Sequence, residues 1–249
     1  MTSLRHLVKI LIVISVLLLV SCSSGSNVLL SQQDIYGSGV LDQETRTFAG
    51  GCTGVTFAAA GDLDIELGAQ EVLWISAEDN LLPYLESNVM GTTLMIQEAS
   101  GVDLRPSLPV EFDLTISQLD ELTHVGVGTI DIDSPASTQL SLTLSGVGEI
   151  NANNYSGQVL DVTQTGVGDV RVSGGVISQT VVVSGVGDYE GAALMSMSAV
   201  VTLTSAGSVT VRVSGTLDVT ITGSGTVYYI GNPVITSNIT GTGSLQKIG

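Results

Sequence analysis

Basic and aromatic residues are scarce in this sequence of 249 residues. Lys and Arg number 7 against 24 Asp and Glu, which gives a formal net charge of −17. Such acidity argues against a nucleic-acid partner and against electrostatic docking on anionic lipid. Aromatic residues make up 4% of the chain and are scattered, so carbohydrate recognition by stacked rings has no support in the sequence.

Long hydrophobic runs are also missing. The longest, residues 10–20, is interrupted only by Ser15 and is too short to span a bilayer, but it fits the core of a signal peptide. It follows the basic residues Arg5 and Lys9 and ends in Leu-Val-Ser-Cys at residues 19–22. This ending resembles the bacterial lipobox, with Cys22 as the lipidated first residue of the mature protein. The alternative is a plain secretory signal with a chance cysteine.

The lipobox resemblance implies that residues 1–21 are a lipoprotein signal peptide and that the membrane partner is reached through lipid on Cys22. Ser23 follows the cysteine, and by analogy with Gram-negative lipoproteins this implies the outer membrane of the cell envelope. Without Arg5 and Lys9 the basic residues fall from 7 to 5, so the mature charge is −19. Since one acyl chain binds only marginally, the three chains of a lipoprotein, palmitate among them, would provide the anchor. Residues 22–43 are polar and predict a flexible tether.

Lipidation of Cys22 leaves Cys52 as the second and last cysteine, so no intramolecular disulfide is expected. No histidine lies near Cys52 in the sequence to activate it. We therefore interpret Cys52 as a buried or turn thiol and not as a nucleophile.

What the chain has in abundance is a repeated turn between residues 122 and 249. Successive turns begin 20, 20, 19, 20, 18 and 18 residues apart, and a fixed period near twenty indicates a repeat architecture. Six of the seven turns are Gly-x-Gly, and the fifth is Ser205-Ala206-Gly207. The glycines of these turns are Gly126, Gly128, Gly146, Gly148, Gly166, Gly168, Gly185, Gly187, Gly223, Gly225, Gly241 and Gly243.

Between the turns, apolar and polar residues alternate in short runs rich in Val, Thr and Ile, a pattern typical of β-strands. A meander of hairpins would explain the strands but not the constant interval. We therefore predict an all-β fold, a single-stranded β-helix (β-solenoid) with coils of about 20 residues and Gly-x-Gly corners. Two columns of inward residues are expected. The column before the turn is Leu144, Val183, Leu203, Ile221 and Ile239, and the column after it is Ile130, Ile150, Val170, Val209, Val227 and Leu245.

Two physical reasons explain glycine at such corners. Glycine adopts positive φ without a Cβ penalty, and a side chain would collide with the same position one coil away. A nucleotide-binding interpretation is poor because no helix follows these turns.

Residues 44–121 have strand patterns without the period. Residues 62–67 alternate strictly, further strands are expected around residues 73–75, 94–96 and 112–116, and an irregular or helical turn is expected at 80–87 around Pro83. We predict one solenoid domain at 44–249, with irregular coils at 44–121 that cover the open end of the regular repeats at 122–249.

Several segments resemble one bacterial family of unknown function, described as a putative autotransporter adhesin, head GIN domain. The resemblance covers roughly residues 46–249 and rests on Phe48, residues 61–65, 81–85, 91–94 and 227–233, and the Gly-x-Gly series. It implies a β-helix similar to pectin-lyase folds, no conserved catalytic set, and a role in adhesion. Family members typically have Gly-Ser-Gly followed by Asp, whereas here the turn is mostly Gly-Val-Gly.

The candidate chemistry lies in an acidic column after the turn, formed by Glu149, Asp169 and Asp188. On successive coils these carboxylates would lie about 5 Å apart. That separation would suit a glycosidase pair or a Ca²⁺ site, although Asp after a Gly turn more often bonds the local backbone and faces water. His124 and Gln164 fall in the inward column, where we expect hydrogen-bonded core or end-cap residues.

We therefore predict a non-enzymatic, envelope-anchored β-solenoid lipoprotein that acts as an adhesion or interaction scaffold and needs no cofactor. An envelope glycan or protein partner and homo-oligomerisation stay open. The rival prediction is a carbohydrate-active enzyme, a polysaccharide lyase or hydrolase, on the same β-helix. It would need convergent carboxylates and a basic residue in a groove.

Overall fold

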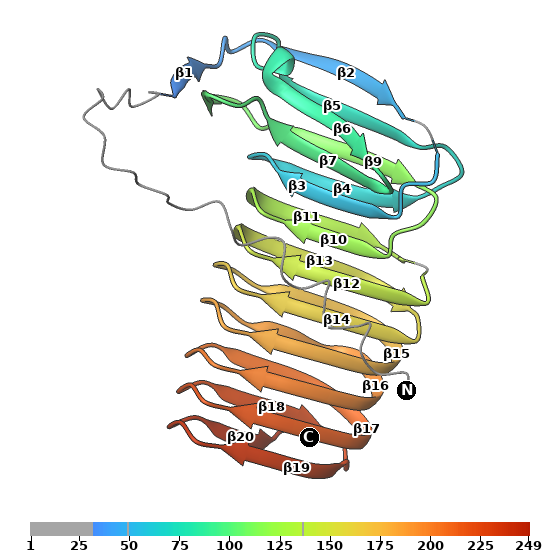
Figure 1. Ribbon diagram of the computed structural model, residues 1–249, viewed down its shortest axis with the longest axis vertical. Helices are drawn as coiled ribbons and strands as arrows, with labels where there is room; N and C mark the ends of the chain where they lie inside the picture. Colours follow the sequence, from blue (N-terminus) through green and yellow to red (C-terminus); the bar gives the residue numbers. More distant parts are fainter. Residues whose placement is uncertain (1–31, 49, 136) are drawn as a thin grey trace, which may run out of the picture. The chain divides into compact units, whose positions relative to one another are not determined.

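The computed structural model describes residues 32–48, 50–135 and 137–249. Residues 32–249 form one compact unit, a β-solenoid of about 6 turns (Figure 1). The predicted fold class is therefore confirmed. Each regular coil crosses two faces, which we name the pre-corner face and the post-corner face after their position relative to the Gly-x-Gly corner.

Both faces are parallel sheets in which successive coils lie in register. The pre-corner face contains β3 (Gly54–Ala58), β10 (Glu121–His124), β12 (Gln139–Leu144), β14 (Val159–Gln164), the later parts of β15 (Val170–Val183), β16 (Tyr189–Leu203) and β17 (Ser208–Ile221), and β19 (Val234–Ile239). The post-corner face contains β4 (Asp62–Leu67), β11 (Val127–Asp133), β13 (Val147–Ser156), the early parts of β15 to β17, β18 (Thr226–Ile230) and β20 (Ser244–Lys247).

The core lies between these faces and contains the two predicted columns together with further buried residues on both faces. Leu144 pairs with Gln164, and the column continues through Val183, Leu203, Ile221 and Ile239. In the other column Tyr189 joins the predicted residues, since it lies between Val170 and Val209. The central members are fully buried, and each such aliphatic side chain contributes roughly 1.5–3 kcal/mol.

The two edges of the stack differ. At the corner edge, the chain reverses through the tight Gly-x-Gly turns. At the opposite edge, β15, β16 and β17 run without a break from the post-corner face to the pre-corner face (Figure 1). Register shifts between neighbouring coils are concentrated at this rounded edge.

The N-terminal coils stack in an order that differs from their order in the chain. β7 (Thr93–Glu98) pairs with β3, and β9 (Glu111–Ile116) pairs with β4. On their other side β3 and β4 pair with β10 and β11. Strands from residues 44–121 thus pair into the same stack, but a later segment lies outside the β3–β4 coil, which explains the missing period.

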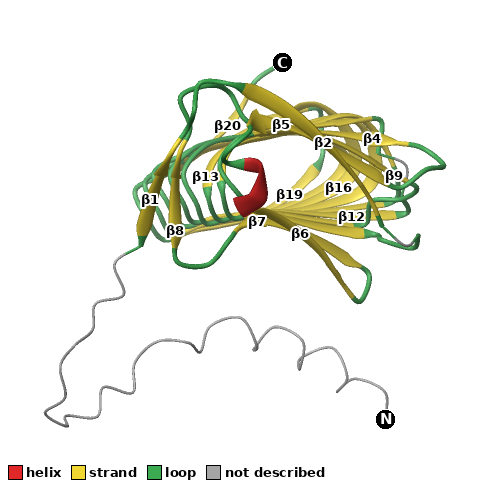
Figure 2. Cartoon of the chain, turned by 90° about the horizontal axis from the view of Figure 1, so that it is seen from above, coloured by secondary structure: helices red, strands yellow, loops and turns green. Residues whose placement is uncertain are grey.

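Antiparallel strands close this end of the stack. β5 (Val72–Glu78) pairs with β9 and with β2 (Leu41–Thr47), and β6 (Leu85–Met90) pairs with β7. The predicted turn at 80–87 contains the 3-10 helix η1 (Leu82–Tyr84), which Figure 2 shows between the two faces. Leu81, Leu82 and Leu85 are buried there, so they shield the core from solvent at this end.

A separate parallel pair, β1 (Gln33–Tyr36) with β8 (Val102–Arg105), completes the described strands. Because β1 and the start of β2 lie within 22–43, the tether prediction is wrong from residue 33 onward, and the folded unit begins before residue 44. The signal peptide, Cys22 and the first part of the tether lie outside the described residues. Within the described part, no helix has the length and apolar character needed to cross a membrane.

Candidate functional site

The corner glycines are required mainly by close stacking. A Cβ added to Gly146 would lie 2.5 Å from the carbonyl oxygen of Val125 and closer still to that of Gly126, one coil away. Its φ is not positive, so the expected conformational reason does not apply to the first glycine of this turn. Gly148 meets both conditions, with φ of +147° and a Cβ position 2.8 Å from the carbonyl carbon of Gly128. The predicted crowding is confirmed at this corner, and positive φ occurs only at the second glycine of the first four corners.

Valines project from four consecutive corners. Val127, Val147, Val167 and Val186 are 48–69% exposed and stack on one another from coil to coil. We call this row the valine ridge. The Gly-Val-Gly pattern did not predict an exposed apolar row, because a repeat pattern alone does not show which corner position points outward.

Arg171 pairs with two members of the acidic column, Glu149 and Asp169. Arg171 Nη1 lies 2.5 Å from Glu149 Oε2, its Nη2 lies 2.8 Å from Asp169 Oδ2, and its Nε lies 3.4 Å from Glu190 Oε2. Partial burial acts to lower the pKa of Arg171, but the three carboxylates outweigh it and raise the pKa. The sequence feature that predicts the Asp169–Arg171 pair is their two-residue spacing, because alternate residues of a strand project from the same face.

The other oxygens of this column bind backbone groups of the following coil. Asp169 Oδ1 accepts a hydrogen bond of 2.9 Å from Asp188 N, and Asp188 Oδ1 accepts one of 2.6 Å from Ser208 N. Asp62 does the same with Thr129 N at 2.8 Å. The expected local bond is thus a bond between coils. Among the described residues no group of three or more His, Cys, Asp or Glu could hold a metal ion, and cation binding by this ladder stays the alternative hypothesis.

His124 and Gln164 do point into the core, as expected. His124 is fully buried 5.8 Å from the Phe57 ring centroid, and burial lowers its pKa, which favours the neutral ring. Neither of its ring nitrogens has a hydrogen-bond partner among the described residues, so the expectation of a satisfied histidine is wrong. Gln164 donates through Nε2 to the Gly168 carbonyl, while its Oε1 is unpartnered within the described part.

A fully bonded polar chain lies deeper in the C-terminal coils. The Tyr189 hydroxyl donates to Gln179 Oε1 over 3.0 Å, Gln179 Nε2 donates to Ser196 Oγ over 2.9 Å, and Ser196 Oγ donates to a backbone oxygen. Cys52 is buried as predicted, and burial followed by the Glu71 charge raises its pKa, which makes it a poor nucleophile.

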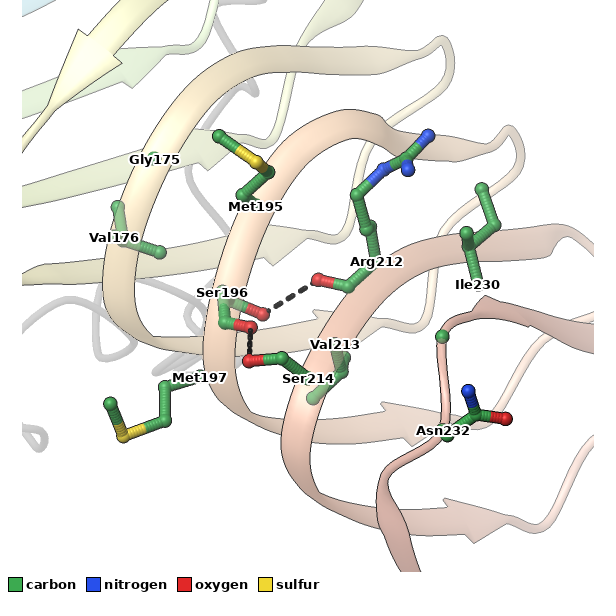
Figure 3. A pocket seen from close by; sticks show the side chains of 11 residues that line it. Gly175, Val176, Met195, Ser196, Met197, Arg212, Val213, Ser214, Ile230 and Asn232 are labelled. Carbon is green, nitrogen blue, oxygen red and sulfur yellow. Dashed lines mark hydrogen bonds between the residues drawn. The ribbon is translucent and has the colours of Figure 1, made fainter. Parts of the chain in front are cut away.

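A hollow of about 670 Å³ lies on the rounded edge (Figure 3). Hydrogen bonds between neighbouring coils form its floor, from Ser196 Oγ to the Arg212 carbonyl at 2.9 Å and from Ser214 Oγ to the Ser196 carbonyl at 3.1 Å. Met195 and Met197 stand beside it, 65% and 61% exposed. No aromatic or acidic side chain lines it.

Coil length explains why the hollow is there. The coil from Gly185 to Ser205 spans 20 residues and the next spans 18. Gly191 pairs with Val211 and Met195 pairs with Arg212, so three residues of β16 have no partner across this step. The wider coil therefore overhangs the narrower ones and leaves a concave surface beside them. The shortening from 20 to 18 residues was visible in the sequence, but the sequence did not show at which edge of the stack the coils become shorter.

The family model described as "Putative auto-transporter adhesin, head GIN domain" matches residues 52–233. Among solved structures, a putative adhesin from Bacteroides fragilis NCTC 9343 is 22% identical with a TM-score of 0.80, covering 86% of this chain and 100% of its own. A putative lipid binding protein from Parabacteroides distasonis ATCC 8503 is 25% identical with a TM-score of 0.71, covering 87% and 100%.

A putative adhesin from Parabacteroides merdae ATCC 43184 is 16% identical with a TM-score of 0.64, again covering 87% of this chain and 100% of its own. No curated protein matches the chain. All of each related structure corresponds to about six sevenths of this chain, so these structures share the solenoid fold.

Proposed function

Because the chain belongs to the family described as putative auto-transporter adhesin, head GIN domain, we propose that it is a non-enzymatic, lipid-anchored interaction scaffold of the bacterial envelope. The family and its adhesin relatives support an adhesion or interaction role. We assign the contact surface to the valine ridge.

The observation that carries this assignment is the exposure of valine where the corner does not require it. Later corners have Ala206, Ser224 and Thr242 at the same position. The glycines on each side meet the geometric demands of the turn, so a polar residue would serve equally well. Contiguous exposed apolar groups are typical of interaction sites, and a stacked row offers one repeated contact along several coils.

The test is binding of residues 32–249 to an array of bacterial envelope glycans and host matrix proteins. Val147→Ser with Val167→Ser should reduce binding to the recognised spots by roughly tenfold or more, since each buried apolar contact contributes about 1 kcal/mol. The matched control is Val200→Ser with Ile177→Ser, two similarly exposed aliphatic residues on other surfaces. Equal loss in both variants, or no loss in the ridge variant, would contradict the assignment.

The anchor is a separate part of the proposal and rests on the signal core and Leu-Val-Ser-Cys at residues 19–22. In a lipoprotein-processing bacterium the full chain should incorporate labelled palmitate and fractionate with the outer membrane. Cys22→Ala should abolish the label and either release the protein or leave an uncleaved precursor. Normal cleavage with unchanged membrane partitioning of that variant would contradict lipid anchoring.

The absence of catalysis is likewise proposed. Support comes from Arg171, which engages Glu149 and Asp169 and so occupies the carboxylates that a glycosidase or lyase would use. Neutral and acidic glycans incubated with the protein should stay intact. Cleavage that disappears when Glu149, Asp169 and Asp188 are all replaced by Asn would instead identify a carbohydrate-active enzyme.

A further inference from the structure

We propose that the hollow on the rounded edge binds an acyl chain that carries an anionic head group. This site is independent of the valine ridge and of the lipid on Cys22. The acyl chain would lie against Met195, Met197 and Ile230, and the head group would be held by Arg212, with Lys247 beside it.

The charge pattern of the basic residues points to an anion. Arg46, Arg105 and Arg171 each bind at least one carboxylate. Within the described residues, Arg212 and Lys247 form no ion pair, although the chain carries far more acids than bases.

Both of these cations are positioned at the hollow by neutral groups. Arg212 lines it and donates from Nε to the Ala192 carbonyl over 2.7 Å, which leaves its two terminal nitrogens for a ligand. Lys247 Nζ donates over 2.8 Å to Asn232 Oδ1, and Asn232 also lines the hollow. Residues 219–249 contain no Asp or Glu, so β18, β19 and β20 bring no acidic side chain to the site. An anion is therefore accommodated here and repelled by most of the remaining surface.

The apolar part of the lining points to a flexible chain. Met195 and Met197 have unbranched, flexible side chains that adapt to ligands of variable shape. The volume of about 670 Å³ lies within the range of roughly 300–1,000 Å³ found for small-molecule sites. Since no aromatic ring lines the hollow, stacking on a sugar or a base is not its chemistry.

The methionines also provide the assay. Residues 32–249 contain four of them, Met90, Met95, Met195 and Met197, and Met90 has the same 65% exposure as Met195 but lies in β6 at the capped end. With ¹³C-methyl-labelled methionine, dodecanoate below its micellar concentration should shift the Met195 and Met197 signals and leave Met90 and Met95 in place. Dodecyl maltoside, with the same chain and a neutral head, should bind roughly tenfold more weakly. Propionate, a head group without the long chain, should give no shift.

Comparison with dodecyl phosphate identifies the source of the anion. Tighter binding of dodecanoate would indicate a fatty acid, and tighter binding of dodecyl phosphate would indicate a phospholipid. Arg212→Gln should weaken dodecanoate binding roughly tenfold, whereas Arg105→Gln, which removes a paired cation at the other end, should not. Equal shifts of Met90 and Met195, equal affinity for dodecyl maltoside, or the absence of any shift would each overturn the proposal.

Discussion

The two glycines of one corner allow crowding and backbone strain to be measured separately. In Gly146→Ala the new Cβ meets the Val125 and Gly126 carbonyls, while the backbone conformation stays ordinary. Overpacking of this kind costs roughly 1–3 kcal/mol. In Gly148→Ala the Cβ is equally crowded and the residue must also hold φ at +147°, which adds roughly 1–3 kcal/mol.

We therefore expect Gly146→Ala to lower the free energy of unfolding by roughly 1–3 kcal/mol and Gly148→Ala by roughly 2–6 kcal/mol. For a unit of this size each kcal/mol lowers Tm by about 2–4 °C. Val147→Ala, between the two glycines and half exposed, is the control and should change stability by less than about 0.5 kcal/mol.

Urea unfolding followed by circular dichroism measures these differences. Because stacked repeats can unfold in parts, amide exchange of the coils on either side of residue 146 should accompany it. The stacked-corner explanation is refuted if Gly146→Ala is as stable as Val147→Ala. The strain explanation alone is refuted if Gly146→Ala and Gly148→Ala lose the same stability.

Three further outcomes follow from the polar residues. His124→Leu should stabilise the protein by about 1–2 kcal/mol, because it removes two unpartnered buried nitrogens. Since burial lowers the folded pKa of His124, wild-type stability should fall as pH drops below about 6.5, and urea midpoints of the variant should lack that slope. The hydrogen bond from Ser107 lowers the pKa of Glu78 in the folded protein. Ionised Glu78 therefore stabilises the fold above about pH 4.5, and this stabilisation is lost as pH falls through the folded pKa. In Glu78→Gln the urea midpoint should depend less on pH in this acidic range. Arg171→Met should cost roughly 1 kcal/mol and make Tm rise with added Ca²⁺ in the variant only; a Ca²⁺-dependent Tm in the wild type would favour a cation ladder instead.

The regular coils were predictable because one physical requirement recurs in every repeat. Each corner must bend and must let neighbouring coils approach, and the strands on both sides must bury alternate residues. The glycine spacing therefore aligns the coils, and that alignment predicts which apolar residues form the inward columns. On the last coil Leu245 and Ile239 keep the expected register, but Ile239 is exposed because no further coil in the described residues covers it. Tyr189 was missed because its column otherwise holds only aliphatic residues.

The N-terminal part was harder because its pairing is not between chain neighbours. Nothing in residues 54–67 reveals that their partners are the segments at 93–116 and 121–133. The hollow was also invisible, since it arises from a difference between coil lengths and not from a motif. Arg171 is an intermediate case: its two-residue spacing from Asp169 predicts a shared face, but its pairing with Glu149 depends on how neighbouring coils stack.

The position of the β3–β4 coil has a consequence for the order in which the chain can fold during synthesis. Regular coils meet partners about twenty residues away, so each can add to the preceding one as soon as it emerges. The β3–β4 coil differs, because Asp62 and its partner Thr129 are 67 residues apart. When β3 and β4 emerge, both of their sheet edges are unpaired, and they stay so until β7 and β9, and then β10 and β11, have been made. We expect the unpaired edges of β3 and β4 to be the part of the nascent chain most prone to pair with strands of other molecules. Once these edges are paired, the remaining coils can add one after another.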